Sequence, residues 1–149
     1  MKIEEEIKQR KFINGRQKAH LNILFTANWL VDKTKEVLKP FDLTHQQYNV
    51  LRILKGRFPD SCAAYDIKEV MIDKGPDLTR LIDRLIVKDY VTRSECEENR
   101  RKLDITITKK GLDLIKKIEP LLKKQLIDQA KITNKEAGEL SRILDKMRG

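Results

Sequence analysis

Apolar positions recur at helical spacing along most of the chain, and the period shortens to that of a β-strand after Asp89. Strong helical patterns cover about residues 17–39, 44–56, 65–72, 76–88 and 111–131, and another follows residue 134. Alternating patterns at about 90–93 and 103–108 predict two strands that form a hairpin. The first 18 residues are highly charged and fit either a helical arm or a frayed end. We therefore expect a mainly α protein with a small β-hairpin (α+β).

The most informative stretch is the predicted helix at about 76–88. Its apolar residues are spaced at i, i+3, i+4 and i+7: Leu78, Leu81, Ile82 and Leu85. Pro76 suits the first helical turn, where its missing N–H lacks a partner anyway. The opposite side carries Asp77, Arg80 and Arg84, with Thr79 and Asp83 at its edge. A short helix with arginines on its exposed side is a shape that the major groove of DNA accepts.

The neighbouring segments predict a winged helix-turn-helix. A short helix at 65–72, with Ile67, Val70 and Met71 expected to point inward, precedes the candidate recognition helix, and a turn containing Gly75 joins the two. The hairpin that follows is placed as a wing, with a polar loop at about 94–102. That loop carries Arg100, Arg101 and Lys102, and also Glu95, Glu97 and Glu98. The basic residues either enter a minor groove or form surface ion pairs with the glutamates.

Longer helices flank this unit on both sides. Pro40 is expected to end the first one, and Thr44 with Gln47 predicts a capping box for the next. Pro120 is expected to kink the long helix that follows the wing. We therefore divide the chain into an N-terminal dimerisation helix at 1–40, a DNA-binding lobe at 41–110 and C-terminal dimerisation helices at 111–149. These are expected to be parts of one compact chain.

Composition narrows the possible partners. Lys and Arg number 32 against 23 Asp and Glu, a net charge of +9, which favours a polyanionic partner. Aromatic residues are only 5%, so a surface that stacks single-stranded bases is not expected. Cys62 and Cys96 are far apart and give neither a disulfide framework nor a metal motif. The polar, acidic start and the lack of a long apolar run predict a cytoplasmic protein without a membrane segment.

Catalytic motifs are not found in the sequence. It has no Gly-rich phosphate loop, no nucleophile motif and no cluster of histidines or acids. We therefore expect neither enzyme activity nor a bound metal or cofactor.

Several pieces in order resemble the MarR family of winged-helix transcription regulators. They are Leu43-Thr44-x-x-Gln47-x-x-Val50-Leu51, Leu78-Thr79-Arg80-Leu81-Ile82-Asp83-Arg84-Leu85, Val91-x-Arg93, Arg100-Arg101 and Ile107-Thr108-x-x-Gly111. The resemblance implies a homodimer held by its first and last helices. It implies a recognition helix in the major groove and a wing in the minor groove of double-stranded operator DNA. It also implies a repressor that responds to a small-molecule effector.

The chain departs from the family pattern at two positions. Asn99 stands where the wing commonly has an aspartate; it can still accept a hydrogen bond from the wing arginine, but without the charge assistance of a carboxylate. Asp77 stands where the family commonly has Ser or Thr. Its carboxylate either accepts from cytosine N4 or stabilises the helix N-terminus, which we favour.

Three sets of candidate site residues follow. Those expected to contact DNA are Lys74, Asp77, Thr79, Arg80, Arg84, Arg100, Arg101 and Lys102. His20, Trp29 and Tyr48 are candidates for an effector pocket, although such residues are more often part of ordinary packing. Cys96 is interpreted as a plain surface thiol. The rival hypothesis is a winged-helix module that binds another protein and has weak or no specific DNA affinity.

Overall fold

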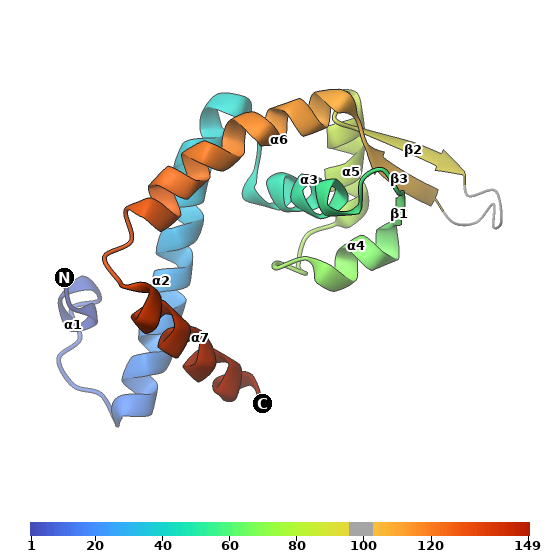
Figure 1. The fold of residues 1–149 in the computed structure, drawn as a ribbon. Helices are drawn as coiled ribbons and strands as arrows, with labels where there is room; N and C mark the ends of the chain where they lie inside the picture. Colours follow the sequence, from blue (N-terminus) through green and yellow to red (C-terminus); the bar gives the residue numbers. More distant parts are fainter. Residues whose placement is uncertain (96–102) are drawn as a thin grey trace.

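The structure, a computed structural model, describes residues 1–95 and 103–149. Its helices are α1 (Ile3–Glu6), α2 (Gly15–Leu38), η1 (Lys39–Phe41), α3 (His45–Arg57), α4 (Ala64–Val70), α5 (Leu78–Val87), α6 (Lys109–Leu122), η2 (Lys123–Asp128) and α7 (Asn134–Arg148). Its strands are β1 (Cys62–Ala63), β2 (Val91–Glu95) and β3 (Leu103–Ile107). Helices α3 to α5 and the sheet form a lobe, from which α2 and α6 extend toward the end that holds both termini (Figure 1). The expected mainly helical winged fold is confirmed.

The sheet has three antiparallel strands in the order β1-β3-β2. In the predicted hairpin Val91 faces Ile107 and Arg93 faces Ile105. Strand β1 was not expected, because two residues are too short to show an alternating pattern. It pairs Cys62 with Ile105 and so places the start of α4 beside the wing.

The core lies between α3, α4, α5, the sheet and the first turns of α6. Its most deeply buried side chains include Leu51, Ile67, Leu85, Ile105 and Ile115. These residues come from five different elements, so the apolar stripes predicted from the sequence meet at one centre. The lobe is therefore a rigid support for whatever its surface carries.

One core expectation was wrong. Val70 was expected to point inward from the third helix, but it is 51% exposed. The helix ends at Val70, and Met71 takes an extended conformation as the C-cap and is buried. Met71 therefore supplies the apolar contact at this corner.

Threonine side chains cap three of the helices, and the cap of α3 by Thr44 was expected. Thr44, Thr108 and Thr133 each accept a hydrogen bond from the backbone N–H three residues on. Pro120 lies inside α6, and the wider π-helical turn η2 follows directly at Lys123.

Apolar side chains remain exposed on α2 and α7. On α2, Leu24 and Trp29 are each 50% exposed, and α7 has no buried residue. Leu140, Ile143 and Met147 form one side of α7 and are about half exposed. In the described residues, no helix is both long enough and apolar enough to span a membrane.

Candidate nucleic-acid interface

Helix α5 presents a polar face because its other face is fully used by the core. Leu78, Leu81, Ile82 and Leu85 are buried, as the spacing predicted. Lys74, Asp77, Thr79, Arg80 and Arg84 are exposed on α5 or in the turn before it. The described DNA-contact candidates therefore share one region of the surface.

The start of α5 differs from the expectation. The helix begins at Leu78, and Asp77 is its N-cap, accepting a hydrogen bond from the Arg80 N–H at 3.3 Å. Pro76 therefore precedes the helix and does not lie in its first turn. The structure gives Asp77 the helix-end role that we favoured, since a carboxylate stabilises the positive end of a helix.

Buried and charged side chains fix the turn that leads into α5, residues 71–77. Asn49 is 8% exposed, and its Oδ1 accepts from the Ile72 N–H at 3.1 Å. Lys68 donates from Nζ to the Pro76 carbonyl at 2.6 Å. Because both ends of the turn are tied to other helices, the position of the Asp77 cap is set by the lobe.

The arginines of α5 have few competing partners. Arg80 Nε lies 3.8 Å from Asp77 Oδ2, but both side chains are mostly exposed, and such pairs contribute little. Asp83 pairs with Arg93 of β2 at 2.9 Å. In the described part of the chain, Arg84 has no carboxylate at ion-pair distance. Both arginines can therefore turn toward an anion at small cost.

The described part of the wing is its two strands. The Asp83–Arg93 pair connects β2 to α5. Arg100, Arg101, Lys102 and Cys96, with the loop glutamates Glu97 and Glu98 and with Asn99, lie outside the described residues. Their expected roles in the wing stay predictions.

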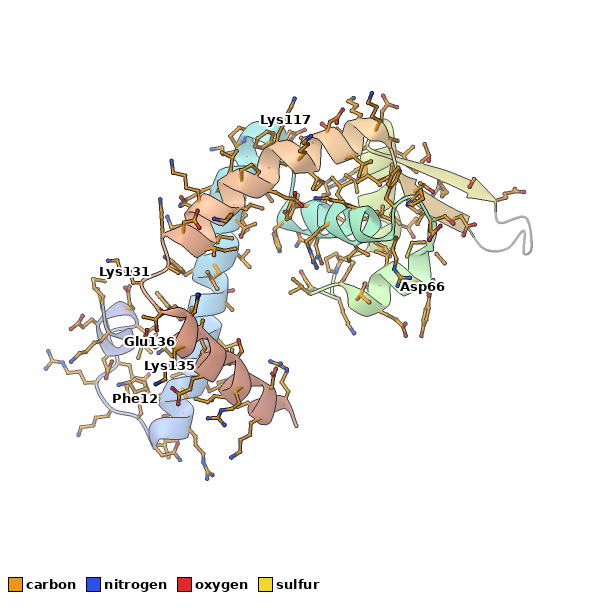
Figure 2. The ribbon with its side chains drawn as sticks, viewed as in Figure 1. Phe12, Asp66, Lys117, Lys131, Lys135 and Glu136 are labelled. Carbon is orange, nitrogen blue, oxygen red and sulfur yellow. The ribbon has the colours of Figure 1, made fainter. Side chains whose placement is uncertain are left out.

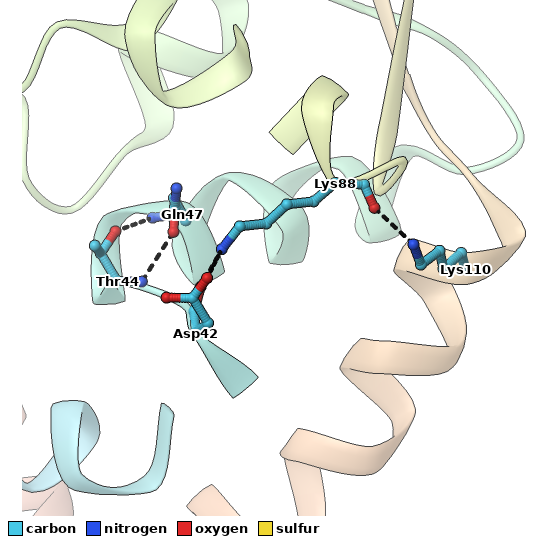
Figure 3. Close-up of polar contacts among 5 residues, drawn as sticks. All are labelled: Asp42, Thr44, Gln47, Lys88 and Lys110. Carbon is cyan, nitrogen blue, oxygen red and sulfur yellow. Dashed lines mark hydrogen bonds and ion pairs between the residues drawn. The ribbon is translucent and has the colours of Figure 1, made fainter. Parts of the chain in front are cut away.

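A polar cluster holds the other end of α5 to the joint between α2 and α3 (Figure 3). Lys88, the C-cap of α5, pairs with Asp42 Oδ2 at 2.6 Å and also donates to the Asp42 carbonyl. The hydrogen bond from Lys88, and then its charge, lower the pKa of Asp42. Lys110 donates to the Lys88 carbonyl at 2.9 Å, and the Thr44–Gln47 capping box lies beside Asp42 (Figure 3). The recognition helix is thus fixed at both ends.

A hollow of about 1060 Å³ lies between α2, α3 and α5. Its charged lining residues are Lys35, Lys39, His45, Arg84 and Lys88, together with the carboxylates of Asp32, Glu36, Asp42 and Asp83. Partial burial, and then the charge of Lys35, lower the pKa of His45, so the imidazole favours its neutral form. The hollow is not lined by His20, Trp29 or Tyr48: His20 and Trp29 are exposed on α2, and Tyr48 is half-buried on α3. In the described residues, acids, imidazoles and thiols form no group of three suited to a metal.

Fold and surface together define a winged helix-turn-helix protein with long flanking helices. The MarR family model matches residues 43–103. SarZ of Staphylococcus saprophyticus, an HTH-type transcriptional regulator, is 32% identical over 117 residues, which are 77% of each chain. The chain belongs to the MarR family.

Solved structures agree with this assignment. A MarR transcription factor from Planctomyces limnophilus is 32% identical, with a TM-score of 0.70 over 93% of this chain and 98% of that one. A mutant of E. coli MarR, complexed with operator DNA, has a TM-score of 0.79 over 93% and 99% at 23% identity. At 23% identity, the similarity to the E. coli protein shows only that the two share a fold.

Sequence reasoning missed the groups that position α5. Asn49 and Lys68 gave no signal, because their partners are backbone atoms of a turn. A sequence signal did exist for Lys88. It is four residues after Arg84, as Arg84 is four after Arg80, so it lies on the same side of the helix.

Proposed function

We propose that the protein is a homodimeric, sequence-specific regulator of transcription that binds double-stranded DNA, and that it acts as a cytoplasmic repressor. Helix α5 enters the major groove and the wing enters the neighbouring minor groove. The observation that carries this proposal is the exposed Arg80–Arg84 face on a helix that is held at both ends. An arginine in a fixed position pairs with the O6 and N7 atoms of guanine through two hydrogen bonds.

The homodimer is supported by the uncovered apolar surface of α2 and α7. Leu24, Trp29, Leu140 and Ile143 are each about half exposed, which is unusual for a face that meets only water. A second copy of the chain covers these side chains. A two-fold dimer also presents two recognition helices, which reach successive major grooves when they are about 34 Å apart.

The effector is proposed to bind in the hollow between α2, α3 and α5. Arg84 lines this hollow and also stands on the DNA-contact face. A small anion that pairs with Arg84 or Lys88 competes directly for the group that DNA needs, and it also disturbs the Lys88–Asp42 tether. Binding of such a molecule is therefore expected to release DNA.

The test compares Arg80→Ala, Arg84→Ala and the double variant on duplexes from the upstream region of the protein's own gene. Losing one base-contacting arginine costs about 1–3 kcal/mol, so we expect the double variant to bind the specific site about 30-fold more weakly, or worse. Arg10 and Arg16 lie far along the chain from α5, and the variant with both changed to alanine keeps the same net charge as the test variant. It is expected to bind like the parent.

Two outcomes would count against the proposal. Equal binding by the Arg80/Arg84 variant and the parent would mean that this face does not contact DNA. A parent protein without specific affinity, even at low salt, would favour the protein-binding module instead, because phosphate contacts are strongest at low salt.

A further inference from the structure

Helix α6 and the start of η2 carry lysines in three adjacent pairs. The pairs are Lys109–Lys110, Lys116–Lys117 and Lys123–Lys124, each seven residues from the next. Seven residues are almost two helical turns, so the pairs lie along one side of the helix. All six side chains are exposed, and Lys117 marks the middle of α6 in Figure 2. We call these six residues the basic ridge.

Most of the charge of the basic ridge is uncompensated. Lys123 pairs with Asp128 at 2.6 Å, and Lys110 lies 3.9 Å from Asp89. Within the described residues, the other four lysines have no ion-pair partner. Six ammonium groups thus stand against the carboxylates of Asp89, Asp113 and Asp128, a surplus of three positive charges. Such a concentration of one sign attracts a polyanion.

The N-terminal end of the basic ridge is hollowed. A depression of about 430 Å³ is lined by Lys109, Lys110 and Lys117, together with Tyr90 and Leu114 and with Asp113. Lys110 Nζ lies 5.3 Å from the centre of the Tyr90 ring, which holds that ammonium over the depression. With three lysines and one aspartate around it, the depression carries a net positive charge, which favours a phosphate group.

The basic ridge is separate from the base-reading face but adjoins it. Lys110 donates to the carbonyl of Lys88, which caps the C-terminal end of α5. Asp77 caps the opposite end, so the two caps are about 16 Å apart at 1.5 Å per residue. The row of Arg80, Arg84 and Lys88 therefore leads from the proposed operator surface to the start of the basic ridge.

We infer that the basic ridge binds the phosphate backbone of duplex DNA that flanks the operator, an inference that rests on the proposed function. The apolar side of α6, with Ile115 and Ile118, is buried in the core and is not free to enter a membrane. Lysine is depleted at the centres of protein–protein interfaces, whereas it meets phosphate as a point charge. The ridge spans about 22 Å, enough for roughly three phosphate contacts.

The test uses DNA length. The binding constant is measured for a minimal operator duplex and for the same operator with about one helical turn, roughly 10 bp, added on each side. The ridge variant changes Lys109, Lys116, Lys117 and Lys124 to glutamine, a good helix former, so that α6 is kept. A matched control changes Lys2, Arg10, Lys11 and Arg16 to glutamine, with the same loss of charge at the other end of the chain.

We expect the parent and the control to bind the long duplex more tightly than the short one. About three phosphate contacts per subunit, six per dimer, make this gain in the binding constant fall roughly 2,000-fold between 50 and 200 mM salt. The ridge variant should bind the short duplex like the control, but its binding constant should not increase on the long duplex. Asp113→Asn removes a carboxylate from the ridge and should enlarge that gain.

Other results would overturn the inference. Equal losses on both duplexes would place the basic ridge in the operator contact itself, and an unchanged gain in the ridge variant would make it a solvated surface. Ridge-dependent binding to vesicles of anionic lipid, without any effect of DNA length, would assign it to a membrane. A parent protein that fails on the minimal operator instead contradicts the proposed function, which keeps the two failures distinct.

Discussion

Gly111, in the first turn of α6, lies against the backbone that links α5 to β2. A Cβ atom added there would be 2.3 Å from the Tyr90 carbonyl oxygen and 2.8 Å from Ile107 Cγ1. The Tyr90 oxygen also accepts the Thr108 N–H at 3.0 Å. Because the nearest obstacle is backbone, it cannot be relieved by rotating a side chain. We predict that Gly111→Ala destabilises the protein.

Two costs and one gain set the change in the free energy of unfolding. Forcing a methyl group into a packed site costs about 1–3 kcal/mol, and losing the Thr108 hydrogen bond costs about 1 kcal/mol more. The higher helix propensity of alanine returns up to about 1 kcal/mol. The net loss is about 2 kcal/mol, which corresponds to a Tm roughly 4–8 °C lower for a chain of this size.

The assay is thermal and urea unfolding at one fixed protein concentration, because the stability of a dimer depends on concentration. Gly56→Ala in α3 is the matched control, since a Cβ there meets no atom within 4 Å. It should raise the stability by up to about 1 kcal/mol. A Gly111→Ala variant as stable as the parent would refute the argument from the Tyr90 contact.

Two further predictions concern the tether and the dimer. Lys88 lowers the pKa of Asp42 in the folded state. The ion pair therefore contributes its full stability at pH values above the ordinary aspartate pKa of about 4. This contribution is lost as the pH falls through the lowered pKa of Asp42 in the folded protein. Asp42→Asn, which tolerates the positive φ of 51° at this position, should therefore be less stable than the parent at neutral pH and approach it in acid. Parallel melting curves across the pH range would show that the pair contributes nothing. Replacing Trp29 and Ile143 by aspartate should shift the mass in light scattering from dimer to monomer and weaken operator binding, whereas an unchanged mass would place the interface elsewhere.

The sequence was most informative where one local pattern decides the structure. The apolar spacing of Leu78 to Leu85 defines the buried side of α5, and Thr44 with Gln47 marks the start of α3. Such signals come from residues three or four apart, so they can be recognised without knowledge of the fold. For the same reason the arginine face of α5 was predictable.

Contacts between distant segments could not be predicted from the sequence. The Asn49 side chain and the Ile72 N–H are 23 residues apart, and Lys88 is 46 residues from Asp42. No local pattern relates them, because only the packing of α3 against α4 and α5 brings them together. The exposed Val70 was missed for a similar reason: the helix was expected to run to Ile72, and its actual end turns Met71 inward.

The central claim is that Arg80 and Arg84 read base pairs, and selection of bound duplexes from a random library tests it most directly. The parent should select two half-sites about one helical turn apart, and Arg84→Ala should lose the preference at one base pair in each half-site while keeping the others. If the Arg80→Ala and Arg84→Ala variants select the same sequence as the parent, or the parent selects none, the account is contradicted.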